Sequence, residues 1–280
     1  MARSAQVSVL GPVRLLLDGQ DRTPGGALQR RLLCALALQG AGSPGGDLAG
    51  LMWPEGLPTD HRAALQTHVF RLRRLLPEGA ISTTTGGAYR LDLGTDALDA
   101  TRFEAVVYAA AALRAQDPEA AAARLDEALG WWRGTPYDEL AEVDDARIEA
   151  ARLAELGLRA REERFDCLLD LGRHQEALAD LEAFAAHEPL RERPQALLMV
   201  ALHRSGRRAD ALATYDRFRR GLAADLGIDP SAGLRDLHDA IVTDEVRAPA
   251  APPPSRAAAG SVPRFGSRLI GRDPLLVEVV

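Results

Sequence analysis

Short apolar segments and turn residues alternate along the first part of the chain. Residues 7–10 and 13–19 are apolar and are separated by a Gly-Pro pair, which predicts two strands of a small sheet. Leucines then recur at helical spacing over residues 26–40, and a shorter apolar helix over 45–56 is expected to stop at Pro54. The pattern predicts a small sheet followed by two helices.

Residues 62–76, RAALQTHVFRLRRLL, form an amphipathic segment that carries four arginines. At about 100° per residue, one side of a helix carries the apolar residues Leu65, Val69, Leu72 and Leu76. The opposite side carries Ala63, Thr67, Phe70, Arg71 and Arg74. A helix with an apolar inner stripe and a basic, hydroxyl-bearing outer face can enter a DNA major groove, where arginine reads guanine. Taken alone, the segment fits a solvated charged face equally well.

Residues 81–93, ISTTTGGAYRLDL, combine a β-branched run, a Gly-Gly turn and an alternating second half. This pattern predicts a β-hairpin. A sheet, three helices and a hairpin are the plan of a winged helix, so we assign residues 1–95 to a winged-helix domain with the hairpin as its wing. Arg90 and residues 83–85 are then placed where they could reach a phosphate or the minor groove.

The segment 96–243 has helical periodicity throughout and contains an internal repeat. LGRHQEALADLEAF, from Leu171, aligns with SGRRADALATYDRF, from Ser205, at an offset of 34 residues. This is the period of tetratricopeptide repeats, in which helix pairs stack and bury a continuous core. For the large aromatic residues of the segment, core packing is favoured over a ligand cage: Trp131, Trp132, Tyr137 and Tyr215. The predicted fold is mainly α with a small β component, a winged helix-turn-helix domain followed by an all-α, tetratricopeptide-like repeat domain.

Charge is distributed unevenly along the chain. The net charge is −6, but residues 1–95 hold ten arginines and seven acidic residues, a net charge of +3, and the remainder carries −9. Any contact with DNA is therefore expected in the first part. No apolar run approaches the roughly 20 residues that a spanning helix needs, and the first residues are too polar for a secretory signal. A cytoplasmic, nucleoid-associated protein without a membrane partner is expected.

No arrangement of residues indicates catalysis or a metal site. The acidic run 138–149 has no neighbouring nucleophile pattern, and His61 and His68 are about two helical turns apart, too far to share a metal directly. Cys34 and Cys167 lie in apolar helical patterns, which predicts buried free thiols in a reducing compartment. We expect neither enzymatic activity nor a cofactor in this chain.

The order and spacing of several motifs resemble one family of regulators. VSVLGPVRLLLDG, ALQRRLLCALAL, DLAGLMWPEG, LQTHVFRLRRLLP and GGAYRLDL resemble the DNA-binding domain of the Streptomyces antibiotic regulatory proteins. GTPYDEL and HEPLRERPQALLMVALHRSGRRADALATYDRF resemble the bacterial transcriptional activation domain that follows it in that family. The resemblance implies an activator of secondary-metabolite genes that binds direct repeats near the promoter, self-associates there, and recruits RNA polymerase through its sigma factor.

The resemblance makes residues 63–76 the recognition helix and suggests a role for individual side chains. The candidates for reading bases are Thr67, Phe70, Arg71 and Arg74. The candidates for binding phosphates are Arg62, Arg73, Arg90 and Thr84. In the loop 54–61, the candidates for contacting polymerase are Pro54, Glu55 and Asp60. Phe70 departs from the small polar residue expected at its position, and contact with a thymine methyl and cover of the helix flank are equally good explanations.

Two other functions fit the same architecture. A repressor would differ only in where its operator lies relative to the promoter. A repeat-based adaptor would use the winged helix to bind protein, would need no basic outer face, and would show no salt-dependent affinity for duplex DNA.

The end of the chain changes character. Residues 244–267 are rich in proline and alanine, which predicts an extended linker. Residues 268–280, RLIGRDPLLVEVV, resemble the start of the nucleotide-binding ATPase module of large family members. The chain has no phosphate-binding loop motif and no lysine. ATP binding is therefore expected only in a downstream module that this sequence does not contain.

Overall fold

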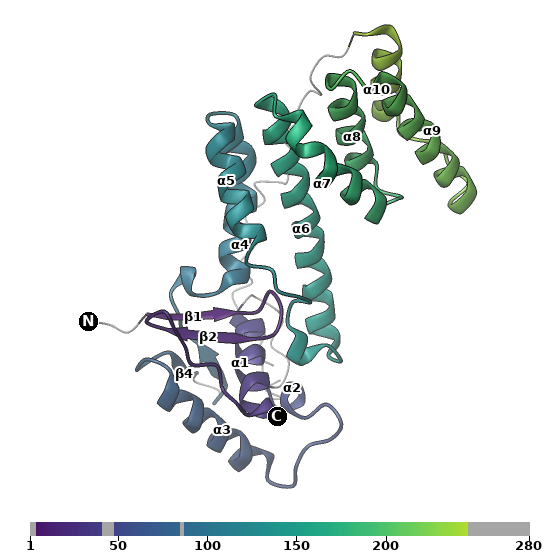
Figure 1. The fold of residues 1–280 in the computed structure, drawn as a ribbon. Helices are drawn as coiled ribbons and strands as arrows, with labels where there is room; N and C mark the ends of the chain where they lie inside the picture. The colour runs from purple at the N-terminus through teal and green to yellow at the C-terminus, as the bar shows by residue number, and fades with distance from the viewer. Residues whose placement is uncertain (1–3, 41–47, 85–86, 246–280) are drawn as a thin grey trace, which may run out of the picture.

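The computed structural model describes residues 4–40, 48–84 and 87–245 (Figure 1). An N-terminal antiparallel sheet has the order β1 (Ala5–Ser8), β2 (Arg14–Leu17) and β3 (Gln20–Asp21). Two strands were predicted. The third is two residues long and wholly polar, so apolar alternation could not reveal it. The predicted linker beyond Glu245 and the segment 268–280 lie outside the described residues.

Three helices and a hairpin complete the winged helix. The helices are α1 (Ala27–Gly40), α2 (Leu48–Met52) and α3 (His61–Leu75), and the hairpin strands are β4 (Ile81–Thr83) and β5 (Tyr89–Leu91). Every residue from 32 to 38 in α1 is buried, because this helix packs against α2, α3 and β5. The helix predicted over 45–56 is present as α2 within the described residues, and it ends two residues before Pro54, where it was expected to stop.

The rest of the described chain is helical. Its α-helices are α4 (Asp99–Arg114), α5 (Pro118–Leu129), α6 (Asp144–Asp170), α7 (His174–His187), α8 (Glu192–Arg204), α9 (Arg208–Asp225) and α10 (Ala232–Thr243). One 3-10 turn, η1 (Thr95–Ala97), precedes α4, and another, η2 (Asp138–Leu140), lies between α5 and α6. In Figure 1, α4, α5 and α6 rise from the sheet, and α7 to α10 continue the stack away from α3. No helix in the described part of the chain is long and apolar enough to span a membrane.

The repeat found in the sequence is a repeat of structure. Gly172 follows α6 and Gly206 follows α8, and both have positive φ, +72° and +76°. The equivalent side chains of α7 and α9 are buried in pairs: Ala177 with Ala211, and Phe184 with Phe218. The mainly helical fold with stacked, repeated helix pairs is confirmed, as is the core position of Tyr137 and Tyr215.

The hydrophobic core is divided inside α6. One buried cluster runs from Val7 through the winged helix and α4 to α6, and ends at Cys167. The second runs from Phe165 to Ile241 through α7, α8, α9 and α10. The winged helix and the first helical hairpin therefore share one core, and the apolar packing is continuous across residue 95.

Two carboxylates, one buried and one half-buried, hold the helical part against the sheet. Asp99, at the start of α4, accepts the backbone N–H of Val9 (2.7 Å) and of Leu10 (3.2 Å). Glu139, in η2, accepts the backbone N–H of Val13 with both oxygens, at 2.9 and 3.0 Å. The turn between β1 and β2 has few sheet partners, so these side chains supply the acceptors that its N–H groups need. We call this contact region, residues 9–13 with Asp99 and Glu139, the junction.

Gly11 is required by the close approach at the junction. Its φ is +135°, and a Cβ there would lie 2.9 Å from backbone atoms of Arg133 and Gly134. Gly11→Ala is expected to lower the free energy of unfolding by about 2 kcal/mol, measured by urea denaturation. Gly50→Ala is the control, because Gly50 is helical and has no atom within 4 Å of its Cβ position. Equal stability of the two variants would contradict this account.

Candidate DNA-binding surface

The outer face of α3 carries the residues that the sequence predicts to read bases. Thr67, Phe70, Arg71 and Arg74 are all exposed, and Phe70 exposes 62% of its surface. Val69 and Leu72 face inward and are buried, and Leu76 just after the helix is buried as well. Leu65, which was predicted to share this stripe, is half-buried. The structure brings the four candidates to one solvent-facing side of a single helix.

The inner side of α3 is held by polar contacts as well as by packing. The Gln29 amide of α1 donates to the carbonyl of His68 (3.3 Å) and lies 2.8 Å from its Nδ1. The Trp53 ring meets the His68 ring edge-on, with centroids 6.4 Å apart. Burial lowers the pKa of His68, and the charge of Arg71 lowers it further. A neutral His68 ring with its proton on Nε2 can accept a hydrogen bond from the Gln29 amide N–H at its Nδ1. These contacts hold the middle of α3 against α1.

Three arginines of α3 have no counter-ion in the described part of the chain. Among the described residues, no carboxylate lies within 4.0 Å of the guanidinium groups of Arg62, Arg71 and Arg74, and none of the three makes a hydrogen bond. Many arginines of the helical stack are instead paired with acids: Arg114, Arg152, Arg164, Arg173, Arg191, Arg193 and Arg207. The outer face of α3 is therefore a concentration of uncompensated positive charge.

Arg73 connects α3 to the wing. Its Nε donates to the carbonyl of Ile81 (3.2 Å), and Nη2 donates to the hydroxyl of Thr83 (2.9 Å). The guanidinium also lies over the Tyr89 ring, 5.5 Å from its centroid. The structure thus gives Arg73 a positioning role that sequence reasoning missed. The phosphate contact predicted for Arg73 stays a prediction. A phosphate would have to bind the same guanidinium that makes these bonds within the protein.

The wing carries the other two predicted phosphate ligands. Arg90 donates from Nε to Asp92 (2.5 Å) and its side chain stays 64% exposed. The hydrogen bond to Asp92 raises the pKa of Arg90. Thr84 is exposed, and its backbone N–H donates to the carbonyl of Ala88 (2.7 Å) to close the turn. Both side chains are accessible, but Arg90 presents a partly neutralised charge.

The loop before α3 is exposed at Pro54 and Glu55. Asp60, at its end, has a structural task, because its carboxylate accepts the backbone N–H of Ala63 (3.2 Å) and caps α3. An aspartate directly before an amphipathic segment is a recognised N-cap signal and could have identified this role. Within α3, the Thr67 hydroxyl donates to the carbonyl of Ala63 (2.9 Å). Its oxygen and methyl group remain available on the outer face.

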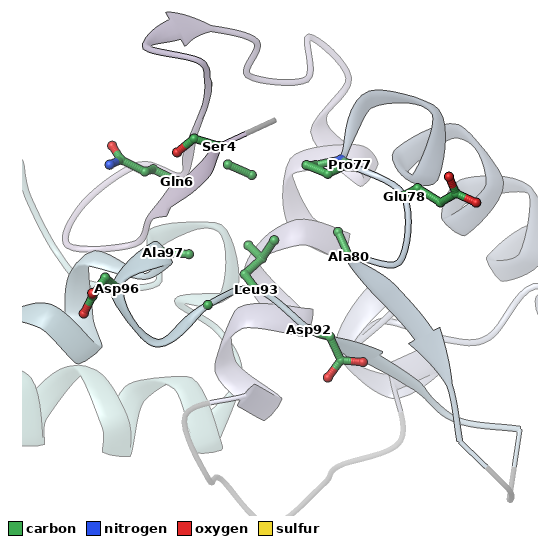
Figure 2. Close-up of a pocket in the computed structure, with 11 residues that line it drawn as sticks. Ser4, Gln6, Pro77, Glu78, Ala80, Asp92, Leu93, Asp96 and Ala97 are labelled. Carbon is green, nitrogen blue, oxygen red and sulfur yellow. The ribbon is translucent and has the colours of Figure 1, made fainter. Parts of the chain in front are cut away.

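A cavity on the flank of the winged helix does not extend the basic surface. It has a volume of about 440 Å³ and lies between β1, the turn after α3 and the segment leading to α4. Figure 2 shows three carboxylates, of Glu78, Asp92 and Asp96, on separate sides of it. The rim of this cavity is acidic, whereas the outer face of α3 is basic.

The described residues offer neither a metal site nor an activated thiol. No group of three or more His, Cys, Asp or Glu side chains there could hold a metal ion. Cys34 and Cys167 are buried free thiols, as predicted. Burial raises the pKa of Cys167 to about 12. Neither thiol is therefore placed as a nucleophile.

Comparison with known proteins gives a consistent class of relatives. A family model described as the bacterial transcriptional activator domain matches residues 98–242, more than half of the chain. Regulatory protein AfsR of Streptomyces coelicolor is 42% identical over 238 residues, which are 84% of this chain and 24% of AfsR. Regulatory protein DnrI of Streptomyces peucetius is 33% identical over 249 residues, which are 85% of this chain and 92% of DnrI.

A solved structure extends the similarity to three dimensions. Mycobacterium tuberculosis EmbR, in complex with a low-affinity phosphopeptide, is 30% identical, with a TM-score of 0.77 over 88% of this chain and 67% of that one. The fold and these relatives define a class of proteins with a winged helix and a helical domain, whose members are named as regulatory proteins. The chain belongs to the bacterial transcriptional activator domain family, which confirms the resemblance to the Streptomyces antibiotic regulatory proteins. It spans about a quarter of the length of AfsR.

Proposed function

We propose that the chain is a sequence-specific DNA-binding transcriptional activator, with secondary-metabolite genes as its targets. The observation that carries the proposal is the outer face of α3, where Arg62, Arg71 and Arg74 are exposed and have no counter-ion among the described residues. Uncompensated arginine on a helix is suited to DNA, because a phosphate contact releases condensed counter-ions and a guanine contact forms charge-assisted hydrogen bonds with the base. The family and its relatives, which are named as regulators, support regulation over catalysis.

The proposed roles follow from position on the surface. Thr67, Phe70, Arg71 and Arg74 occupy the middle and end of the exposed face and read base edges in the major groove. Phosphates are bound by residues around this face and on the wing: Arg62, Arg73, Arg90 and Thr84. Protomers associate on direct repeats, and RNA polymerase with its sigma factor is recruited partly through the loop that contains Pro54 and Glu55.

The test is selection of random duplex DNA by the 280-residue chain, followed by affinity measurements on the enriched and a scrambled site across a salt series. We expect a tandem repeat with half-sites about one helical turn apart, 10 to 11 base pairs. We also expect affinity for the enriched site to exceed that for scrambled DNA by about 10³-fold or more. Weak, salt-sensitive binding without enrichment would contradict the proposal.

The loop before α3 allows recruitment to be separated from DNA binding. Glu55→Ala is expected to leave operator affinity unchanged, because Glu55 lies outside the exposed face of α3 and its side chain makes no hydrogen bond or ion pair with another described residue. It is expected to lower transcription from the operator in vitro several-fold, as loss of one rim contact with polymerase would. Asp60→Ala should instead weaken α3 itself by about 1 kcal/mol. Unchanged transcription by Glu55→Ala would exclude a polymerase contact at this residue.

A further inference from the structure

The exposed face of α3 has a second half that carries no free charge. At about 100° per residue, Thr67, Arg71 and Arg74 occupy one half of this face. Gln66 and Phe70 occupy the other half, and both are exposed. Sequence reasoning gave Gln66 no role. The two halves therefore present different chemistry to whatever α3 binds.

The Phe70 ring has no packing role that would account for its position. It exposes 62% of its surface, whereas the other phenylalanines of the described chain expose at most 6%: Phe103, Phe165, Phe184 and Phe218. Among the described residues, neither another ring nor a guanidinium lies against the Phe70 ring. Arg73, three residues later, lies over Tyr89 of the wing instead. The Phe70 ring gains free energy of burial only when another molecule covers it.

The Gln66 amide lies one helical turn before this ring. It is exposed and makes no hydrogen bond with another described residue. Side chains four residues apart on a helix are neighbours, with Cβ atoms about 5–6 Å apart. His68, between the two in sequence, contacts Gln29 of α1 on the inner side of the helix. A fixed turn of α3 therefore presents an unpaired amide beside an uncovered ring.

The surroundings of the pair indicate what covers it. Arg62, Arg71 and Arg74 are exposed on the same helix and have no counter-ion among the described residues. In Figure 1, α3 lies at the end of the molecule opposite α7 to α10, so the helical stack leaves its outer face open. Positive charge around the pair complements the phosphates of DNA. In the major groove, an A·T pair offers a partner for each side chain: N6 and N7 of adenine for a glutamine amide, and the thymine methyl for an apolar ring.

We propose that Gln66 and Phe70 together read A·T in the operator. The Gln66 amide donates from Nε2 to N7 of adenine and accepts from N6 at Oε1, and the Phe70 ring packs on the thymine methyl. Stacked base pairs are about 3.4 Å apart, so the two side chains can reach one A·T pair or two adjacent ones. This inference rests on the proposed DNA binding by α3. It adds a base pair to the guanines that Arg71 and Arg74 read, so each half-site combines A·T with G·C.

The experiment uses base analogues in the operator that the 280-residue chain selects. Uracil in place of thymine removes only the methyl group, and at one position it is expected to lower wild-type affinity about three- to fourfold. 7-Deazaadenine removes the N7 acceptor and is expected to lower wild-type affinity about fivefold. Phe70→Ala should be insensitive to uracil, and Gln66→Ala to 7-deazaadenine. Because neither side chain is charged, both variants should keep the wild-type slope of log affinity against log salt.

Two matched variants control for the loss of a ring or an amide elsewhere. Tyr108→Ala removes a ring that is 67% exposed on α4, and Gln175→Ala removes an exposed amide from α7. Both should bind the operator and its analogues as the wild type does. Phe70→Ala and Gln66→Ala should keep wild-type affinity for scrambled DNA, which shows that they fold.

The outcomes separate this inference from the proposed function. An enriched operator without A·T in its half-sites would overturn the inference and leave the proposed function intact. So would wild-type affinity for either set of analogues, or an analogue effect that persists in the variant lacking the matching side chain. Absence of any enriched operator would reject the proposed function and, with it, this inference.

Discussion

Replacing Arg71 or Arg74 by alanine is expected to lower affinity for the selected operator by about 10- to 100-fold, with a smaller loss on scrambled DNA. A bidentate contact between arginine and guanine contributes about 1–3 kcal/mol to discrimination between bases. Neither side chain has a hydrogen-bond or ion-pair partner among residues 4–40, 48–84 and 87–245, so its removal should leave the fold intact. Fluorescence anisotropy on both DNAs across a salt series measures the effect.

Two control variants make this result specific. Arg90→Ala should weaken binding to operator and scrambled DNA alike and should reduce the slope of log affinity against log salt by about 1, as expected for a phosphate contact. Arg219→Ala removes the same charge from α9 and should change neither affinity. Equal losses on both DNAs for Arg71→Ala and Arg74→Ala would reject the assignment of these residues to base reading.

Loss of the Asp99 carboxylate is expected to have the largest effect on stability. Asp99→Ala leaves the N–H groups of Val9 and Leu10 buried without an acceptor, and each such group costs about 1–3 kcal/mol. We expect the free energy of unfolding to fall by about 3 kcal/mol, measured by urea denaturation with unchanged slope.

Asp96→Ala is the matched control for Asp99→Ala. Asp96 is three residues earlier, is exposed, and accepts no hydrogen bond in the described part of the chain, so its removal should change stability by less than about 0.5 kcal/mol. Asp99→Asn should lie between the two, because its amide oxygen can accept one N–H while its NH₂ group opposes the other. Wild-type stability in Asp99→Ala would show that the junction does not hold the sheet to α4.

The periodicity of apolar residues predicted the helices that are determined by residues close together in the sequence. The amphipathic spacing in residues 62–76 located α3 to within a residue, and the offset of 34 located the repeated helices α7 and α9. The exposed face of α3 followed from the same spacing. These features depend on residues a few positions apart, and sequence patterns report them directly.

The parts that were missed depend on contacts between distant residues. Asp99 meets Val9 across 90 positions and Glu139 meets Val13 across 126, so no local pattern could reveal the junction or the shared core. The sequence assigns Arg73 only to a phosphate contact, because its bonds to Ile81 and Thr83 depend on how the hairpin folds back on α3. Chain topology, which periodicity does not contain, decides these contacts.

The length of α6 and its place in both hydrophobic clusters have a mechanical consequence. Its 27 residues make a rod of about 40 Å that is packed at one end in the core of the winged helix and at the other in the core of the repeats. A protein bound to the repeats α7–α10 would therefore be held at a fixed distance and orientation relative to DNA bound by α3. Its encounter with a neighbouring promoter complex would be governed by orientation as much as by local concentration.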